Sequence, residues 1–218
     1  MEYDESFASS MIDLHDDLKE EIVLRLEEFR RLWEQRDDMA ILKELFFCIL
    51  TPQSKATTCW GAVEELSCND LLLRGDYQQV LKIVGIVRFK YRKASYILEA
   101  RNKFFHDGKI TIISHLEEFD DPVEARQWLV GEVKGFGFKE ASHFLRNIGL
   151  GEDLTILDRH ILKNLSRAGV IPEVPSSMTP SRYLEIERKM MAYCDHLGIP
   201  PSHLDLMLWY KEAGSIFK

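Results

Sequence analysis

The chain has 218 residues, of which 45% are hydrophobic and 29% charged, and its formal net charge is −8. This length and composition are typical of a globular protein with one domain or two small lobes, and they exclude a disordered or fibrous chain. No apolar run reaches the roughly 20 residues of a membrane span, and the acidic N-terminus lacks the basic start of a signal peptide.

The negative charge is concentrated at the N-terminal end. Residues 1–40 carry a net charge of −8, so the rest of the chain is neutral, and within it residues 82–110 carry a net charge of +6. In that segment Arg88 and Lys90 alternate with Phe89 and Tyr91, a composition typical of surfaces that bind nucleic-acid backbones. A solvated basic helix face has the same composition, so this segment alone does not decide between the two interpretations.

Hydrophobic spacing predicts helices along the whole chain. Apolar residues three and four positions apart predict amphipathic helices, and a nearly continuous apolar run that ends at Thr51-Pro52 predicts a buried one. Asp121-Pro122 is an N-cap followed by proline at the first helical position, Gly149 and Gly151 end a later helix, and the prolines of 171–180 mark a loop. The expected helices cover residues 18–34, 41–50, 92–106, 122–133 and 183–197.

These elements predict an all-α fold, since the single short β-branched run, residues 110–113, is too isolated to form a sheet. We expect two helical lobes. One combines residues 1–50 with 151–218, and the other is a helical-barrel lobe over residues 51–150 that ends in a hairpin between two helices.

That hairpin, residues 134–138, is the most informative stretch of the sequence. Two glycines, Gly135 and Gly137, stand one residue apart between two helical segments, where they permit positive φ and close approach of a partner. The N–H groups at the start of the second helix could then bind an anion such as phosphate. A glycine hairpin is also simply a way to turn between antiparallel helices, and the spacing favours neither interpretation.

Two residues that follow the hairpin are candidates for chemistry. Lys139 lies in the first helical turn, where the helix dipole favours the neutral amine that a Schiff-base nucleophile needs. Asp158 lies nineteen residues later, where it could cap a helix or place a carboxylate in a cleft beside Lys139. For a single lysine or aspartate the structural role is the more common one.

With the hairpin, Lys139 and the run Ile156-Leu157-Asp158-Arg159-His160, residues 133–165 resemble the helix-hairpin-helix DNA glycosylase superfamily. More narrowly, the chain is similar to the archaeal-type (type 2) 8-oxoguanine DNA glycosylase/AP lyases. Three further stretches, residues 48–54, 87–94 and 204–218, agree with that family. The resemblance therefore covers nearly the whole chain.

The resemblance implies a DNA repair enzyme whose active-site cleft lies between two lobes. In base excision repair of this kind the damaged base is flipped out of the duplex into the cleft. Lys139 would be the nucleophile that displaces 8-oxoguanine and forms a Schiff base, and Asp158 the assisting carboxylate. β-Elimination at the abasic site would follow, so the enzyme would be both glycosylase and lyase.

Further positions acquire roles only through the resemblance. From the residues alone, Trp209 would be a core aromatic and Asp205 a surface carboxylate. The resemblance implies that both, with the terminal Lys218, recognise the oxidised base and that Gln53 is the DNA wedge. The residues that would bind the DNA backbone are Lys134, Gly135, Phe136, Gly137, Phe138, Arg88 and Lys90.

We expect neither a metal centre nor an iron–sulfur cluster. Endonuclease III-like relatives hold such a cluster on four closely spaced cysteines, whereas Cys48, Cys59 and Cys68 lie far from Cys194 and no C-x₂-C pair exists. So few cysteines indicate free thiols and a cytoplasmic protein. Family hairpins often hold a monovalent cation on main-chain carbonyls. The expected partner is duplex DNA with oxidised guanine, bound by a monomer without membrane association.

Other functions remain open at this point. The chain could be a bifunctional glycosylase for oxidised pyrimidines, although the absent cluster and the C-terminal Lys218 favour 8-oxoguanine. A non-catalytic helix-hairpin-helix module would grip phosphate without using Lys139 or Asp158. An acidic protein-interaction domain would show no salt-dependent affinity for DNA.

Overall fold

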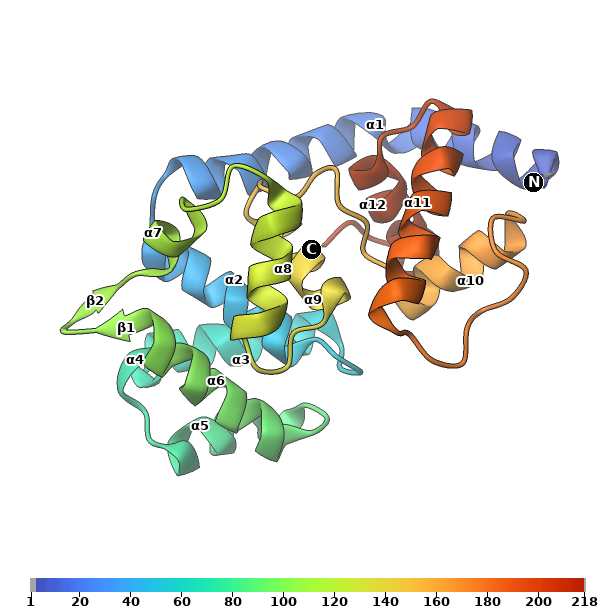
Figure 1. Cartoon of the computed structure of the whole chain (residues 1–218). Coiled ribbons are helices and arrows are strands. Elements are labelled where there is room, and N and C mark those ends of the chain that lie inside the picture. Colours follow the sequence, from blue (N-terminus) through green and yellow to red (C-terminus); the bar gives the residue numbers. More distant parts are fainter. Residues whose placement is uncertain (1–2, 218) are drawn as a thin grey trace.

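The computed structural model describes residues 3–217, which form twelve α-helices, one short 3₁₀-helix and a two-stranded hairpin (Figure 1). In chain order these are α1 (Glu5–Glu34), α2 (Asp38–Leu50), α3 (Ala56–Cys68), α4 (Leu71–Arg74), α5 (Tyr77–Ile83), η1 (Val84–Ile86), α6 (Lys90–Phe104), β1 (Phe105–His106), β2 (Lys109–Ile110), α7 (Ile112–Leu116), α8 (Pro122–Glu132), α9 (Phe138–Asn147), α10 (Arg159–Arg167), α11 (Pro180–Leu197) and α12 (Pro201–Ala213). The all-α prediction is confirmed.

Helix α1 runs along both halves of the molecule (Figure 1). Its buried residues recur at three- and four-residue intervals, so they form one stripe along a helix whose other faces carry the acidic side chains. The stripe consists of Ala8, Met11, His15, Leu18, Ile22, Leu26 and Phe29. The N-cap Asp4 accepts a hydrogen bond from the Phe7 N–H. The helix is thus longer at its N-terminal end than the predicted 18–34.

The buried side chains form two separate cores. The first extends from Ile41 in α2 to Leu154 after α9, and the last turn of α1 packs against it through Leu32 and Trp33. The second unites most of the α1 stripe with α10, α11 and α12. Burial of such contiguous apolar surface is the main favourable contribution to folding.

The two cores differ from the two predicted lobes in the place of one helix, α2. The predicted terminal lobe includes residues 38–50, but their buried side chains lie in the first core. Most of the helix α2 is buried, including all of residues 45–50, so it suits the centre of a helical lobe better than its edge.

The segment around residues 110–113 also differs from its prediction. Ile110 pairs with Phe105, and Lys109 with His106, in a short antiparallel hairpin, while Ile112 and Ile113 begin α7. The β-branched run is therefore split between the end of a strand and the start of a helix. Within residues 3–217 no helix has the combination of length and apolar character required to span a bilayer.

A buried ion pair joins the two cores. The Arg126 guanidinium on α8 donates to both carboxylate oxygens of Glu187 on α11, at 2.6 and 2.9 Å. Arg126 is only 1% exposed, and its guanidinium also lies over the rings of Phe138 and Tyr183. These two rings stack on each other with centroids 5.5 Å apart, so the ion pair between α8 and α11 lies against an aromatic contact between α9 and α11.

We expect Glu187→Ala to destabilise the fold strongly, because the variant leaves the buried Arg126 charge without its partner. Loss of one member of a buried pair lowers the free energy of unfolding by about 3 to 5 kcal/mol. Glu185→Ala is the matched control, since Glu185 lies on the same helix and pairs with Lys189 at the surface. Urea unfolding should show a large loss for Glu187→Ala and little change for Glu185→Ala; equal effects would contradict a clamping role.

Candidate active site

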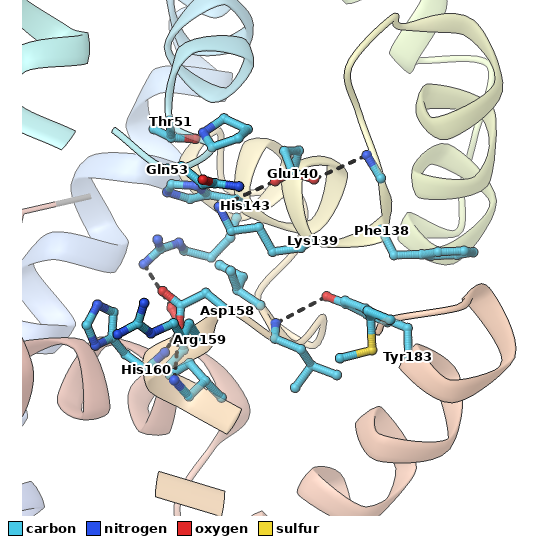
Figure 2. Close-up of a pocket in the computed structure, with 18 of the residues that line it drawn as sticks. Thr51, Gln53, Phe138, Lys139, Glu140, His143, Asp158, Arg159, His160 and Tyr183 are labelled. Atoms are coloured by element: carbon cyan, nitrogen blue, oxygen red, sulfur yellow. Dashed lines mark hydrogen bonds and ion pairs between the residues drawn. The ribbon is translucent and has the colours of Figure 1, made fainter. Parts of the chain in front are cut away.

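A cleft of about 1090 Å³ lies between the two cores. The first core contributes residues 51–54 after α2 and the start of α9, and the second contributes residues 156–161, the start of α11 and two residues of α12. Figure 2 shows Lys139 and Asp158 in the same part of this cleft, one from each core. The sequence prediction that places both residues at a cleft between lobes therefore agrees with the structure.

Lys139 is the second residue of α9, and the helix start fixes its position. Gly137 is the N-cap, and its N–H donates to Glu140 Oε2 at 3.2 Å. The Lys139 Nζ lies 3.7 Å from Glu140 Oε1, and the lysine side chain is 23% exposed. A partly buried lysine on a rigid helix, facing a cleft, has the placement that a nucleophile requires.

The two hairpin glycines serve different purposes. Gly135 has φ of 90°, and a Cβ there would lie 2.6 Å from the Tyr96 ring, so both conformation and packing require glycine. Gly137 is extended, with φ of −109°, so its conformation does not require glycine. The expectation that both glycines provide positive φ was thus right only for Gly135.

Asp158 is both the N-cap of α10 and a cleft residue. Its Oδ1 accepts hydrogen bonds from the backbone N–H groups of His160 and Ile161, each at 2.8 Å. The capping interpretation is therefore correct, but it does not compete with a chemical role. Both bonds use Oδ1, so the cap fixes the carboxylate in place while Oδ2 can engage a bound group.

The segment that leads to Asp158 is held by Tyr183 on α11. The Tyr183 hydroxyl donates to the Thr155 carbonyl at 2.7 Å and accepts from the Leu157 N–H at 3.3 Å. Burial raises the pKa of this phenol far above its ordinary value, so it stays a donor. Since the Tyr183 ring also stacks on Phe138, the residue before Lys139, one side chain touches both halves of the site.

Asp205 and Trp209 on α12 line the cleft beside Lys139 and Asp158. Asp205 is only 5% exposed, and its Oδ2 lies 3.4 Å from Arg146 Nη1. Burial raises the pKa of Asp205 to about 6, Arg146 opposes that shift and the charge of Asp158 adds to it. The Trp209 indole N–H is buried and has no hydrogen-bond partner within the described residues, so it could bind a ligand acceptor.

The other predicted site residues are divided between the cleft and its surroundings. Gln53 and Arg88 are exposed and line the cleft, as do Gly137 and Phe138. Lys90, Lys134, Gly135 and Phe136 lie outside the cleft lining; Lys134 and Gly135 are exposed, whereas Phe136 is buried. Lys218 lies outside the described residues.

Several residues that support the site were not among those predicted from the sequence. Arg146, Tyr183 and Lys93 all contact cleft segments, and each lies on a mainly buried face of its helix. A signal was present for Lys93, because it shares a helix face with Ile97, Ala100 and Phe104. Over residues 3–217 no three His, Cys, Asp or Glu side chains gather closely enough to hold a metal ion.

Comparison with known proteins gives one consistent result. The family described as 8-oxoguanine DNA glycosylase matches residues 22–199. A relative from Fusobacterium nucleatum, named 8-oxoguanine DNA glycosylase/AP lyase, is 48% identical over 194 residues, which cover 89% of each chain. A relative of the same name from Methanocaldococcus jannaschii is 36% identical over 205 residues, covering 94% of this chain and 95% of that protein.

Solved structures agree with these sequence matches. The 8-oxoguanine DNA glycosylase of Thermotoga maritima superposes with a TM-score of 0.86 at 32% identity, covering 98% of this chain and 99% of that one. The M. jannaschii 8-oxoguanine glycosylase/lyase in complex with a 15mer DNA containing 8-oxoguanine gives a TM-score of 0.83 at 33% identity, covering 96% of this chain and all of that one.

The raised pKa of Asp205 predicts a pH-dependent stability. The folded state keeps the proton up to about pH 6, whereas the unfolded state loses it near 3.8. The stabilisation from this group is therefore complete below pH 3.8 and lost as the pH rises through 6. Urea unfolding of Asp205→Asn and the unsubstituted protein should show the latter losing stability relative to the variant over this range. A difference that does not change with pH would contradict the assignment.

Proposed function

Because the chain belongs to the 8-oxoguanine DNA glycosylase family, we propose that it excises 8-oxoguanine from duplex DNA and then cleaves the strand as an AP lyase. The observation that carries the proposal is the meeting of Lys139 and Asp158, one from each core, in a single cleft. A base inside a duplex is out of reach, so the enzyme flips the damaged nucleotide into this cleft, at a cost of a few kcal/mol.

Lys139 acts as the nucleophile and Asp158 as its partner. The ammonium of Lys139 first passes a proton to a carboxylate, for which Asp158 is placed in the same cleft. The neutral amine then attacks C1′ as the bond from C1′ to the base breaks, and Asp158 passes its newly gained proton to the leaving base, which restores the Asp158 carboxylate. Positive charge develops on the sugar as the base departs, and the carboxylate of Asp158 stabilises it.

The covalent intermediate explains the second activity. Ring opening converts the amine adduct at C1′ into a Schiff base, which acidifies the C2′ proton. Removal of that proton expels the 3′ phosphate by β-elimination and breaks the DNA strand. An enzyme that used an activated water instead of Lys139 would stop at the abasic site, so the lysine implies lyase as well as glycosylase activity.

Asp205, Trp209 and the terminal Lys218 recognise the flipped base. The unpartnered indole N–H of Trp209 and the buried carboxyl of Asp205 both line the cleft, where they can bond to the edge of an oxidised purine. Lys218 lies outside the described residues, and its role rests on the family resemblance.

The DNA backbone lies along the basic segment, residues 82–110, and the hairpin, residues 134–138. Arg88 at the cleft, Lys90 at the start of α6 and the exposed Lys134 and Gly135 supply charge and main-chain N–H groups for phosphates. The N–H groups of Phe136 and Gly137 already bond within the hairpin, so their neighbours carry more of the phosphate contact. Gln53 enters the duplex as the wedge.

We further propose that the enzyme acts as a monomer in the cytoplasm, on chromosomal DNA, and that its chemistry uses no metal or cluster. The hairpin side chains, residues 134–138, offer no oxygen ligand. Only main-chain carbonyls are available there, the ligands that suit a monovalent cation. Such a cation would hold phosphate and would take no part in the chemical steps.

The alternative functions have less support. Relatives that cover most of the chain are named 8-oxoguanine DNA glycosylase/AP lyase, not pyrimidine glycosylase. A non-catalytic module would leave the shared position of Lys139 and Asp158 unexplained.

Borohydride reduction tests the enzyme class and the nucleophile together. With duplex DNA that contains 8-oxoguanine, reduction should trap a covalent protein–DNA adduct, because it converts the Schiff base into a stable amine. Lys139→Gln should abolish trapping, and Lys19→Gln on the exposed face of α1 is the control. An adduct that survives the loss of Lys139 would contradict the proposed nucleophile.

Substitution of Asp158 separates capping from chemistry. Asparagine is as good an N-cap as aspartate, whereas alanine costs about 1 kcal/mol. We therefore expect Asp158→Asn to keep the stability and DNA affinity while losing most turnover, and Asp158→Ala to lose stability as well. Single-turnover excision and thermal unfolding measure the two effects. Full activity of Asp158→Asn would leave Asp158 with only its capping role.

A further inference from the structure

Lys93 is a buried lysine that the proposed chemistry does not use. It lies in the second turn of α6 on the face that packs into the first core, and only 3% of it is exposed. Buried lysines are rare unless their ammonium group is fully hydrogen-bonded, so the contacts of this group indicate its role.

The Lys93 Nζ donates three hydrogen bonds, to the last residue of α2 and to the loop between α2 and α3. It donates to the carbonyls of Leu50 and Pro52, each at 2.7 Å, and to Ser54 Oγ at 3.0 Å. An ammonium group has three protons, so these bonds use its full capacity. The acceptors lie on both sides of Gln53, which is the exposed residue of this loop that lines the cleft.

The loop has a conformation that needs such support. Gln53 has φ of 55°, in the left-handed region that residues other than glycine seldom adopt. Conformations of this kind cost about 1 to 3 kcal/mol and persist only where the surroundings determine them. Within the loop itself, the Ser54 N–H donates to the Thr51 carbonyl at 2.9 Å. The loop is thus stabilised by the hydrogen bond of its own turn and by the hydrogen bonds from Lys93.

The environment of Lys93 fits a structural cation. Its ammonium sits at the C-terminal end of α2, where the helix dipole favours positive charge, and it bonds one of the last helical carbonyls. Burial lowers the pKa of Lys93 to about 8, with Cys59 and Glu140 opposing the shift and Lys139 adding to it. The Cys59 thiol donates to the same Leu50 carbonyl at 3.2 Å.

The hydrogen bonds around Lys93 also include the basic segment that carries Arg88. Ser54 Oγ, which accepts from Lys93, also accepts from the Arg88 N–H at 3.0 Å. Arg88, like Gln53, is an exposed residue that lines the cleft. One buried ammonium therefore fixes the segments that carry both Gln53 and Arg88.

We propose that Lys93 is a positioning residue, which holds the loop of residues 51–54 rigid so that Gln53 can open a base pair and keep the damaged base in the cleft. This inference rests on the proposed glycosylase function. It assigns Lys93 no contact with the reacting atoms: its effect is exerted before chemistry, on the extrusion of the base.

The test compares a base that must be extruded with one that is already unpaired. Single-turnover excision of 8-oxoguanine is measured in a fully paired duplex and in a duplex where the lesion lies in a small bubble of unpaired bases. Lys93→Met keeps the length and apolar stem of the side chain but removes its donors. Ser54→Ala removes one acceptor with little change in volume, and Lys19→Met is the control for loss of one positive charge.

We expect Lys93→Met to slow excision from the paired duplex by about 10- to 100-fold, the loss that a misplaced positioning group produces. Excision from the bubble should fall by a much smaller factor, because an unpaired base costs less to extrude. Ser54→Ala should give a smaller change of the same kind, and it decides the matter if Lys93→Met does not fold. Fluorescence of 2-aminopurine beside the lesion should show less base opening in both variants.

Three outcomes are distinct. Equal rates for Lys93→Met and Lys19→Met on the paired duplex would overturn the inference. An equal loss on paired and bubble substrates would also overturn it, since that result indicates damage to the chemical step or to the fold. Failure of the unsubstituted protein to excise 8-oxoguanine from either substrate would instead contradict the proposed function on which the inference rests.

Discussion

The active site depends on one constraint, that buried contacts hold two separate hydrophobic cores together. Each core supplies one half of the proposed chemistry, with Lys139 on the first and the Asp158 segment on the second. The bidentate pair of Arg126 and Glu187 fixes the cores to each other, and the stacked rings of Phe138 and Tyr183 lie against it. Because these rings neighbour the segments that carry Lys139 and Asp158, the packing that joins the cores also sets the geometry of the cleft.

Helix termini fix the positions of Lys139 and Asp158 within the cleft. Lys139 is placed by the first turn of α9, and Asp158 is placed by the bonds that cap α10. A helix start leaves backbone N–H groups in need of acceptors, so a carboxylate bound there has little freedom of position. In Asp158 the cap uses Oδ1 alone, so the same carboxylate has Oδ2 left for the proposed chemical role.

The sequence predicted those parts of the fold and site that depend on local patterns. The cap at Asp121-Pro122, the hairpin glycine at 135 and the position of Lys139 and Asp158 in one cleft all follow from short motifs or from the family resemblance. Partners distant in sequence were not predictable. Nothing near Arg126 indicates Glu187, and the separation of α2 from the terminal lobe follows from three-dimensional packing. Lys93 was visible as a lysine on an apolar stripe, but its acceptors are main-chain atoms that carry no sequence signal.

The negative net charge of the chain fits this account, since whole-chain charge governs far-field effects and the binding surface is local. The central claim is that packing between the two cores places one lysine, Lys139, against C1′ of the flipped nucleotide. Peptide mapping by mass spectrometry of the borohydride-reduced complex with 8-oxoguanine DNA tests it most directly. The account predicts a single modified residue, Lys139. Modification of Lys93 or Lys134 instead, or of several lysines alike, would contradict it.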